Sequence, residues 1–233
     1  MQRKKILIAM KRIALVILSV IMAMPIMAQR YESNDYGNSR RNFFSDGSVY
    51  YGLRLGLTIS TVSSDDSRLD GGSAQTGLNL GGVIGFQLSS STPLYLETGL
   101  SYTEKGGKGD VEGNKFTYSL NYLELPIVAK YKYVFEDIDD RFSIQPFVGG
   151  YLAMGIEGKV RDFGKTKEDR KTYSSFSDDF FQRFDGGLRF GCGVEYSMMY
   201  LELAYDFGLA NICHNDFDSS RNSCFYINLG VNF

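Results

Sequence analysis

Phe225-Tyr226-Ile227-Asn228-Leu229-Gly230-Val231-Asn232-Phe233 is the carboxyl-terminal stretch of the chain, and it alternates with a period of two. One face carries large apolar residues, and the other carries Tyr, Asn and Gly. A strand between lipid and a narrow polar lumen has this pattern. The ending therefore predicts a membrane β-strand.

The same alternation recurs in seven earlier segments, and it predicts an all-β fold, an eight-stranded antiparallel up-and-down transmembrane β-barrel. Short and long connections alternate, which is the outer-membrane arrangement with short turns in the periplasm and long loops outside. The apolar phase changes between Tyr122 and Leu123, and we expect a β-bulge there. The expected strands are 49–59, 78–88, 94–102, 116–133, 142–156, 184–196, 201–209 and 225–233, and the expected long loops are 61–75, 103–115, 158–183 and 210–223.

The amino-terminal segment predicts export. Five basic residues precede an apolar run from Ile13 to Met24, with Ala28 at a plausible cleavage point. That run is shorter than the roughly 20 residues of a membrane-spanning helix. We therefore expect a signal peptide at 1–28, starting at Met1 or Met10, then a polar periplasmic lead-in at 29–48 and the barrel at 49–233. The predicted location is the outer membrane of a Gram-negative cell envelope, with its lipid as a partner.

Composition agrees with this location. Gly makes up 26 of 233 residues, more than the roughly 7% average, as expected where small residues line a narrow lumen. The chain has 25 Lys and Arg against 27 Asp and Glu, and five of the basic residues belong to the signal segment. The remaining acidic excess argues against nucleic acid as a partner.

Two segments resemble a known family. Asn121-Tyr122-Leu123-Glu124-Leu125-Pro126-Ile127-Val128-Ala129-Lys130-Tyr131 resembles the Y-L-E-[IL]-P-x-x-x-K-Y segment of the small outer-membrane barrels of Bacteroidetes. The glycine-rich strand 184–196 is similar to the sixth strand of that family, which includes the PorT-like proteins. The resemblance covers residues 49–233 and implies an association with gliding or secretion. In such barrels a terminal aromatic residue is read by the barrel assembly machinery, which makes Phe233 the expected insertion signal.

The face opposite the apolar stripe carries charges of both signs. An eight-stranded barrel is just wide enough for side chains to fill, and unpaired buried charges are costly. We therefore expect a paired, closed interior, with a small-solute or ion pore as the alternative. The expected lumen charge network contains Arg54, Glu97, Glu124, Lys130, Asp185, Arg189, Glu195 and Glu202, and we also place Lys132, Glu157 and Asp206 inside.

No motif indicates catalysis, a cofactor or a metal site. His214 is the single His and lies beside Asp216 and Asp218 in the last long loop, without a matching nucleophile. A lipid-acting or proteolytic barrel enzyme stays as a further alternative. Cys213 and Cys224 flank the His214 to Ser223 part of that loop, and in an oxidising envelope they either form a disulfide or remain two thiols.

The loop 158–183 carries a basic run that either is a solvated surface or holds lipopolysaccharide phosphates or an acidic partner. The main functional hypothesis is a non-enzymatic barrel that acts through contacts with envelope or secretion-system proteins.

Overall fold

The computed structural model describes residues 49–64, 73–89, 91–111, 113–135, 141–163, 171–176, 181–213 and 220–233. The expected signal peptide at 1–28 and lead-in at 29–48 lie outside these residues. The described part holds ten β-strands and no helix with the length and apolar character needed to cross a membrane. The strands are β1 (Val49–Ser63), β2 (Ser73–Ser89), β3 (Thr92–Val111), β4 (Asn114–Tyr131), β5 (Tyr133–Val134), β6 (Phe142–Phe163), β7 (Lys171–Ser174), β8 (Phe184–Tyr196), β9 (Met199–Gly208) and β10 (Arg221–Asn232).

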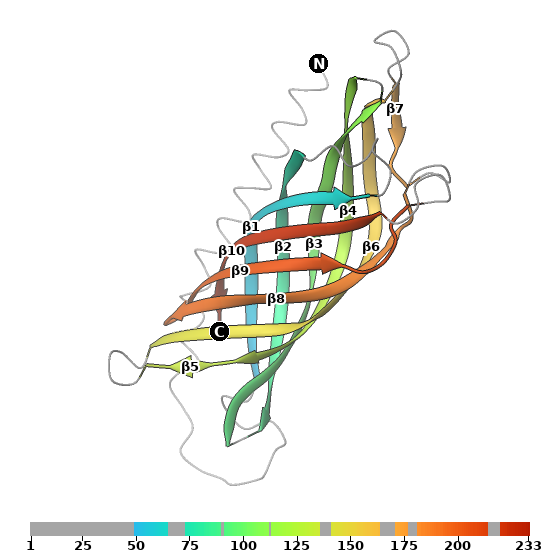
Figure 1. Cartoon of the computed structure of the whole chain (residues 1–233). Helices are drawn as coiled ribbons and strands as arrows, with labels where there is room; N and C mark the ends of the chain where they lie inside the picture. Colours follow the sequence, from blue (N-terminus) through green and yellow to red (C-terminus); the bar gives the residue numbers. More distant parts are fainter. Residues whose placement is uncertain are drawn as a thin grey trace. The chain divides into compact units, whose positions relative to one another are not determined.

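Eight strands form a closed antiparallel ring in the order β1, β2, β3, β4, β6, β8, β9 and β10 (Figure 1). The first and last strands close it through a register that runs from Gly52 opposite Asn232 to Ser63 opposite Arg221. The short β5 and β7 both pair with β6. The predicted eight-stranded barrel is confirmed.

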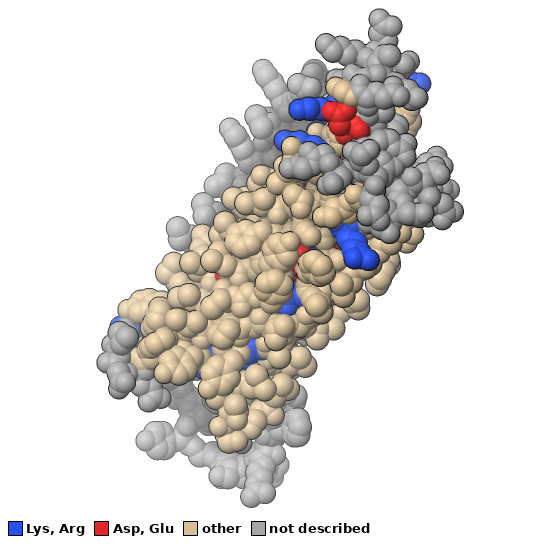
Figure 2. All heavy atoms as spheres, viewed as in Figure 1, with Lys and Arg blue, Asp and Glu red and all other residues tan. Residues whose placement is uncertain are grey.

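The outer wall of the barrel is apolar. Leu55, Leu203 and Leu229 expose 46%, 45% and 63% of their surface, and they stand for a large set of such residues. Leaving this area in water would cost about 25 cal/mol per Å², whereas hydrocarbon accepts it. In Figure 2 uncharged residues cover most of the middle of the described surface, and charged residues gather toward the end where β7 lies in Figure 1.

The bulge predicted in the strand 116–133 is in a different place. β4 keeps one alternation along its whole length, with Tyr122 and Glu124 both buried as successive inward residues. The register between β4 and β6 shifts at this level instead, because Asn121 faces Glu157 while Tyr122 faces Gly155. The extra residue therefore belongs to β6. In β4 the same positions face inward along the whole strand, and the apolar residues move from the inward positions (up to Tyr122) to the outward positions (from Leu123).

All four expected long loops are partly strand, and two of them, at 103–115 and 158–183, are changed most. The expected loop at 103–115 is a hairpin, in which β3 ends at Val111 and β4 begins at Asn114. Gly113 takes the positive φ of 84° at this turn, and its N–H donates to the Asp110 carboxylate at 2.6 Å. The expected loop at 158–183 contains the end of β6 and all of β7. The wall is therefore taller at β3, β4 and β6 than the roughly 9–11 residues that a tilted membrane strand needs.

Candidate functional site: the filled barrel interior

A cluster of five charged residues occupies the middle of the barrel, and we call it the central cluster. Lys105 of β3 places its Nζ 2.9 Å from Glu124, 3.1 Å from Asp206 and 3.5 Å from Asp185. Arg189 of β8 binds Asp206 through two N–H groups at 2.6 and 2.9 Å and Glu124 at 2.5 Å. All five are buried. Each side chain comes from an inward position on its strand, so four different strands converge on one point.

The central cluster has three carboxylates for two cations, and neutral donors complete it. The hydroxyl of Tyr226 donates to Asp206 at 2.8 Å, and Tyr151 donates to Asp185 at 3.3 Å. Asn222 donates to the same Asp185 at 2.9 Å. Buried carboxylates are stable only when paired and hydrogen-bonded, and these donors supply the remaining bonds.

A second group, the periplasmic cluster, lies toward the short turns. Lys130 binds Glu97 at 2.7 Å and the hydroxyl of Tyr200 at 2.8 Å. Tyr50 donates to the same Glu97 at 2.5 Å, and the Arg54 Nη2 is 3.6 Å from it. The Arg54 guanidinium also stacks over the Tyr200 ring, 4.0 Å from its centroid. One carboxylate therefore serves two cations and one hydroxyl.

The periplasmic rim and the space between the clusters are filled as well. At the rim Lys132 binds Glu195 at 2.5 Å, and Asn232 also donates to Glu195. Between the clusters Asn228 donates to Glu202 at 2.9 Å, and Asn79 donates to Asn228 at 3.0 Å. Among the described residues Glu202 has no ion-pair partner.

Interior glycines make room for the interior tyrosines. A Cβ on Gly193 would lie 1.9 Å from the Tyr200 hydroxyl, and one on Gly85 would lie 2.1 Å from the Tyr50 ring. The glycine-rich composition therefore serves packing, because rings and not water occupy the space beside these positions.

Above the central cluster the interior becomes apolar, and we call this part the extracellular core. Tyr118 stacks on Phe181 with ring centroids 5.1 Å apart, and Tyr122 meets Phe176 edge to face at 5.7 Å. Tyr122 also faces down toward Lys105, whose Nζ is 5.7 Å from its ring centroid. The extracellular core contains Val62, Phe116, Tyr118, Leu120, Tyr122, Tyr151, Ala153, Val160, Phe176, Phe181, Ile212 and Cys213.

The structure places all eight residues of the expected network at buried inward positions, but in more than one group. Glu124, Asp185 and Arg189 belong to the central cluster, whereas the others lie nearer the periplasm: Arg54, Glu97, Lys130, Glu195 and Glu202. Asp206 lies inside as expected. Glu157 does not, because it follows the β6 bulge and its side chain is 70% exposed.

Lys105 was missed by sequence reasoning. It lies within the expected loop 103–115, where Gly106, Gly107 and Gly109 follow it closely. The sequence did contain a signal for it. Lys105 lies an even number of residues after Glu97, an inward residue of the preceding strand, so continuing that strand places Lys105 on the lumen face.

The expected disulfide is absent. Cys224 of β10 faces Asp206 on β9 and Ser60 on β1. The backbone of Cys213 instead forms an isolated antiparallel β-bridge with Phe181. Both remain buried thiols. Ile212 already pairs with Ser220, so Cys213 lies beyond the part of the ladder that holds Cys224. The expectation took Cys213 and Cys224 to face each other across neighbouring strands, but β9 ends at Gly208 and the residue that faces Cys224 on it is Asp206.

His214, Asp216 and Asp218 lie outside the described residues. Within the described part no group of three or more His, Cys, Asp or Glu side chains is arranged to hold a metal ion.

A closed ring of lipid-facing antiparallel strands, with short turns at one end and long connections or extended hairpins at the other, defines an outer-membrane β-barrel. The model of the family described as "Outer membrane protein beta-barrel domain" matches residues 27–214. The chain belongs to this family, and it is an outer-membrane protein of the Gram-negative envelope that sits in the lipid bilayer.

Solved structures that are similar to this chain include those of three bacterial surface or outer-membrane proteins. Ail, the attachment invasion locus protein of Yersinia pestis, is 14% identical over 79% of this chain and 98% of its own, with a TM-score of 0.42. OprG of Pseudomonas aeruginosa is 13% identical over 80% and 96%, with a TM-score of 0.43. Neisserial surface protein A is 14% identical over 78% and 95%, with a TM-score of 0.42. None of the curated proteins compared with the chain matches it.

Proposed function

We propose that the protein is a closed barrel that neither conducts nor catalyses, and that it acts through contacts made at its extracellular end. The observation that carries this proposal is the filled interior. Ion pairs and hydrogen bonds occupy the lumen from the Lys132–Glu195 pair at the periplasmic rim to the central cluster, and aromatic rings continue from there.

The energetics of the interior favour closure over a pore. A solute on its way through would have to separate buried pairs such as Arg189–Glu124 and Lys130–Glu97, which are 2.5 and 2.7 Å long. Separating a buried pair costs several kcal/mol, because each charge is left without a partner. An eight-stranded barrel has no spare width through which a solute could bypass them. A pore remains the alternative, but nothing in the described residues favours it.

Conductance tests this proposal. We expect no steady single-channel current when purified full-length protein is inserted into a planar bilayer. Protease protection of the protein in vesicles prepared in parallel would show that it has inserted. The absence of current could then not be explained by failed reconstitution. Steady channels from wild-type protein would establish the pore instead.

The tall side of the barrel is the surface that we propose for contacts. β3, β4 and β6 continue beyond the membrane as paired strands, and binding residues are often carried on such a rigid scaffold. A photo-crosslinker at Thr117 on β4 is expected to capture discrete envelope proteins. The same group at Arg221, exposed on β10 of the shorter side, is the matched control. Equal capture from both positions, or none from Thr117, would contradict the assignment.

A role in secretion is a narrower hypothesis. It depends on the PorT-like resemblance of residues 121–131, and membership of the broad family does not distinguish that branch. Deletion of the gene, scored for the surface proteins that reach the medium, is the direct test. An unchanged set of exported proteins would remove this hypothesis and leave the closed-barrel proposal intact.

We also propose that Phe233 is the insertion signal. Its ring is 51% exposed and stacks on Tyr51, with centroids 6.3 Å apart, while its backbone pairs with Tyr51 across the closing seam. Phe233→Ala and Tyr51→Ala both remove the stacking but keep the backbone bonds. Only Phe233→Ala is expected to lower the outer-membrane fraction. Equal assembly of the two variants would reduce Phe233 to a packing residue.

A further inference from the structure

The outward face of β6 changes character just above its bulge. Met154 and Ile156 are apolar and 52% and 48% exposed, whereas Lys159 and Arg161 follow on the same wall. Arg183, at the entry to β8, is exposed beside them. Three cations therefore lie at the upper edge of the lipid-facing belt, where the headgroups of the outer leaflet begin.

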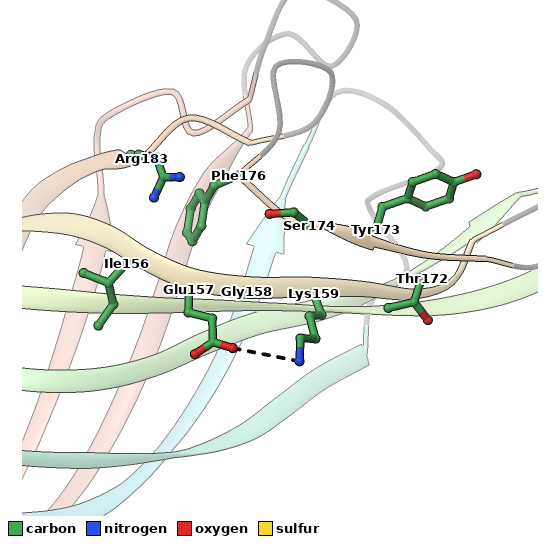
Figure 3. Close-up of a pocket in the computed structure, with 9 residues that line it drawn as sticks. All are labelled: Ile156, Glu157, Gly158, Lys159, Thr172, Tyr173, Ser174, Phe176 and Arg183. Carbon is green, nitrogen blue, oxygen red and sulfur yellow. Dashed lines mark ion pairs between the residues drawn. The ribbon is translucent and has the colours of Figure 1, made fainter.

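Two cavities flank Lys159. One of about 340 Å³ lies between β6 and β7 and is lined by Lys159, Arg183 and Phe176 among others (Figure 3). The other, of about 230 Å³, lies toward β4 and β3 and is lined by Lys159, Arg161 and Glu104 among others. Lys159 lines both cavities, so the two cavities adjoin each other on this part of the barrel.

The described contacts of Arg183 and Lys159 hold these two cations in place without neutralising them strongly. Arg183 donates to the Gly155 carbonyl at 2.9 Å, and its guanidinium lies 5.4 Å from the centroid of the Phe176 ring. Neither contact supplies a negative charge. Lys159 is 3.9 Å from Glu157, but their side chains are 53% and 70% exposed, so water screens this pair strongly. Within the described residues, the charges of Arg183 and Lys159 therefore remain available to an anion.

The rest of the lining fits a sugar. Hydroxyl and amide groups border the two cavities, together with the rings of Tyr173 and Phe176. The polar uncharged lining residues are Gln75, Thr117, Ser119, Asn121, Thr172 and Ser174. Glu104 and Glu157 add acceptors for sugar hydroxyls. Directly below, the exposed Met154, Ile156 and Phe184 present apolar surface on which acyl chains can lie.

We propose that this wall binds a phosphorylated glycolipid of the outer leaflet, with its phosphate groups distributed over Lys159, Arg161 and Arg183 and its acyl chains on the apolar stripe below. Charge complementarity and continuity with the lipid-facing belt support this occupant. A soluble acidic partner would contact the cations but would not cover the apolar stripe below them. The site is on the outside of the barrel, so it is independent of whether the lumen conducts.

Native mass spectrometry of the full-length protein in detergent tests this site with lipid A, an acylated and phosphorylated glucosamine disaccharide. Wild-type protein is expected to retain lipid A and to lose it when the lipid has been dephosphorylated. Lys159→Gln and Arg161→Gln are each expected to weaken binding about fivefold, as for basic residues that meet an anionic lipid surface. Heat-modifiable mobility in electrophoresis would show that each variant is folded.

Arg221→Gln is the matched control, because Arg221 is an exposed cation on β10 at the same end of the barrel. We expect it to change binding by less than about twofold, since β10 pairs with β1 and β9 and not with the strands that line the site. Equal retention of the dephosphorylated lipid, or equal losses in all three variants, would overturn the proposal. So would glucosamine 1-phosphate, which lacks acyl chains, binding as tightly as lipid A.

Discussion

The lower and upper parts of the barrel follow opposite rules. Below the level of Tyr122 the interior is charged and the outer wall is apolar, as Glu124 and Leu125 on β4 illustrate. Above that level the interior is aromatic and the outer wall is polar, as Tyr118 and Asn121 illustrate. One strand with one alternation serves both parts.

This difference shows where the surroundings change. A wall in hydrocarbon must be apolar outside and can satisfy polar groups inside, whereas a wall in water is stabilised by an apolar interior. The inversion on β4 lies at the level of the β6 bulge, which turns Glu157 outward and Val160 inward. The upper part therefore resembles a small water-soluble barrel that is built on the membrane-embedded one.

The largest expected effect is the loss of Lys105 from the lower interior. Lys105→Met should reduce the free energy of unfolding by about 3–5 kcal/mol, because three carboxylates would face Arg189 alone. Urea titration of protein refolded into lipid vesicles measures this. Lys108→Met is the control on the same strand, where an exposed cation should matter by less than about 0.5 kcal/mol. Equal effects would mean that Lys105 is not the centre of the cluster.

A second substitution sharpens this experiment. Asp185→Asn removes one negative charge and keeps a side-chain oxygen that can accept from Asn222 and Tyr151. Added to Lys105→Met, it is expected to recover part of the lost unfolding free energy, since two carboxylates then face one guanidinium. A purely additive double variant would show that charge balance does not govern the cluster.

Sequence reasoning reached the membrane-embedded part well and the upper part poorly. The alternation of Leu, Ile and Phe with Gly and Asn is strict where lipid is on one side, so the strands and the lumen charges could be predicted. Above the membrane the same alternation has reversed polarity, and Phe116 to Tyr122 then suggested a slip. Lys105 was lost for a related reason, since glycines at 106, 107 and 109 are typical of a loop, but here Gly107 leaves space for the Tyr118 ring against β3.

The next effect concerns the extracellular core. Phe176→Ala should cost about 3 kcal/mol, because it empties the space against Tyr122 and Gly155. Phe184→Ala is the matched control, since the Phe184 ring is 50% exposed on the outer wall and faces lipid. Its loss should cost less than about 1 kcal/mol. Both are measured by the same unfolding titration, and a larger effect of Phe184→Ala would contradict the inversion.

A pair of arginines locates the boundary on the outer wall. Leu125→Arg should cost about 2 kcal/mol, because the charge enters the edge of the hydrocarbon region. Asn121→Arg, four residues along the same face of β4, should cost less than about 1 kcal/mol. There the new guanidinium lies between Glu104 on β3 and Glu157 on β6. If both variants lose equal unfolding free energy, the boundary does not lie between these residues.

The smallest effect is expected in the chain of amide side chains that lies between the two clusters. Asn79 accepts from Thr103 at 2.9 Å and donates to Asn228 at 3.0 Å, which in turn donates to Glu202. Asn79→Ser shortens the side chain and loses these bonds without leaving a charge unpaired, so the cost should be about 1 kcal/mol. The unfolding titration should therefore rank it well below Lys105→Met. A cost as large as that of Lys105→Met would mean that the Glu202 carboxylate depends on this amide chain as strongly as the central cluster depends on its cation.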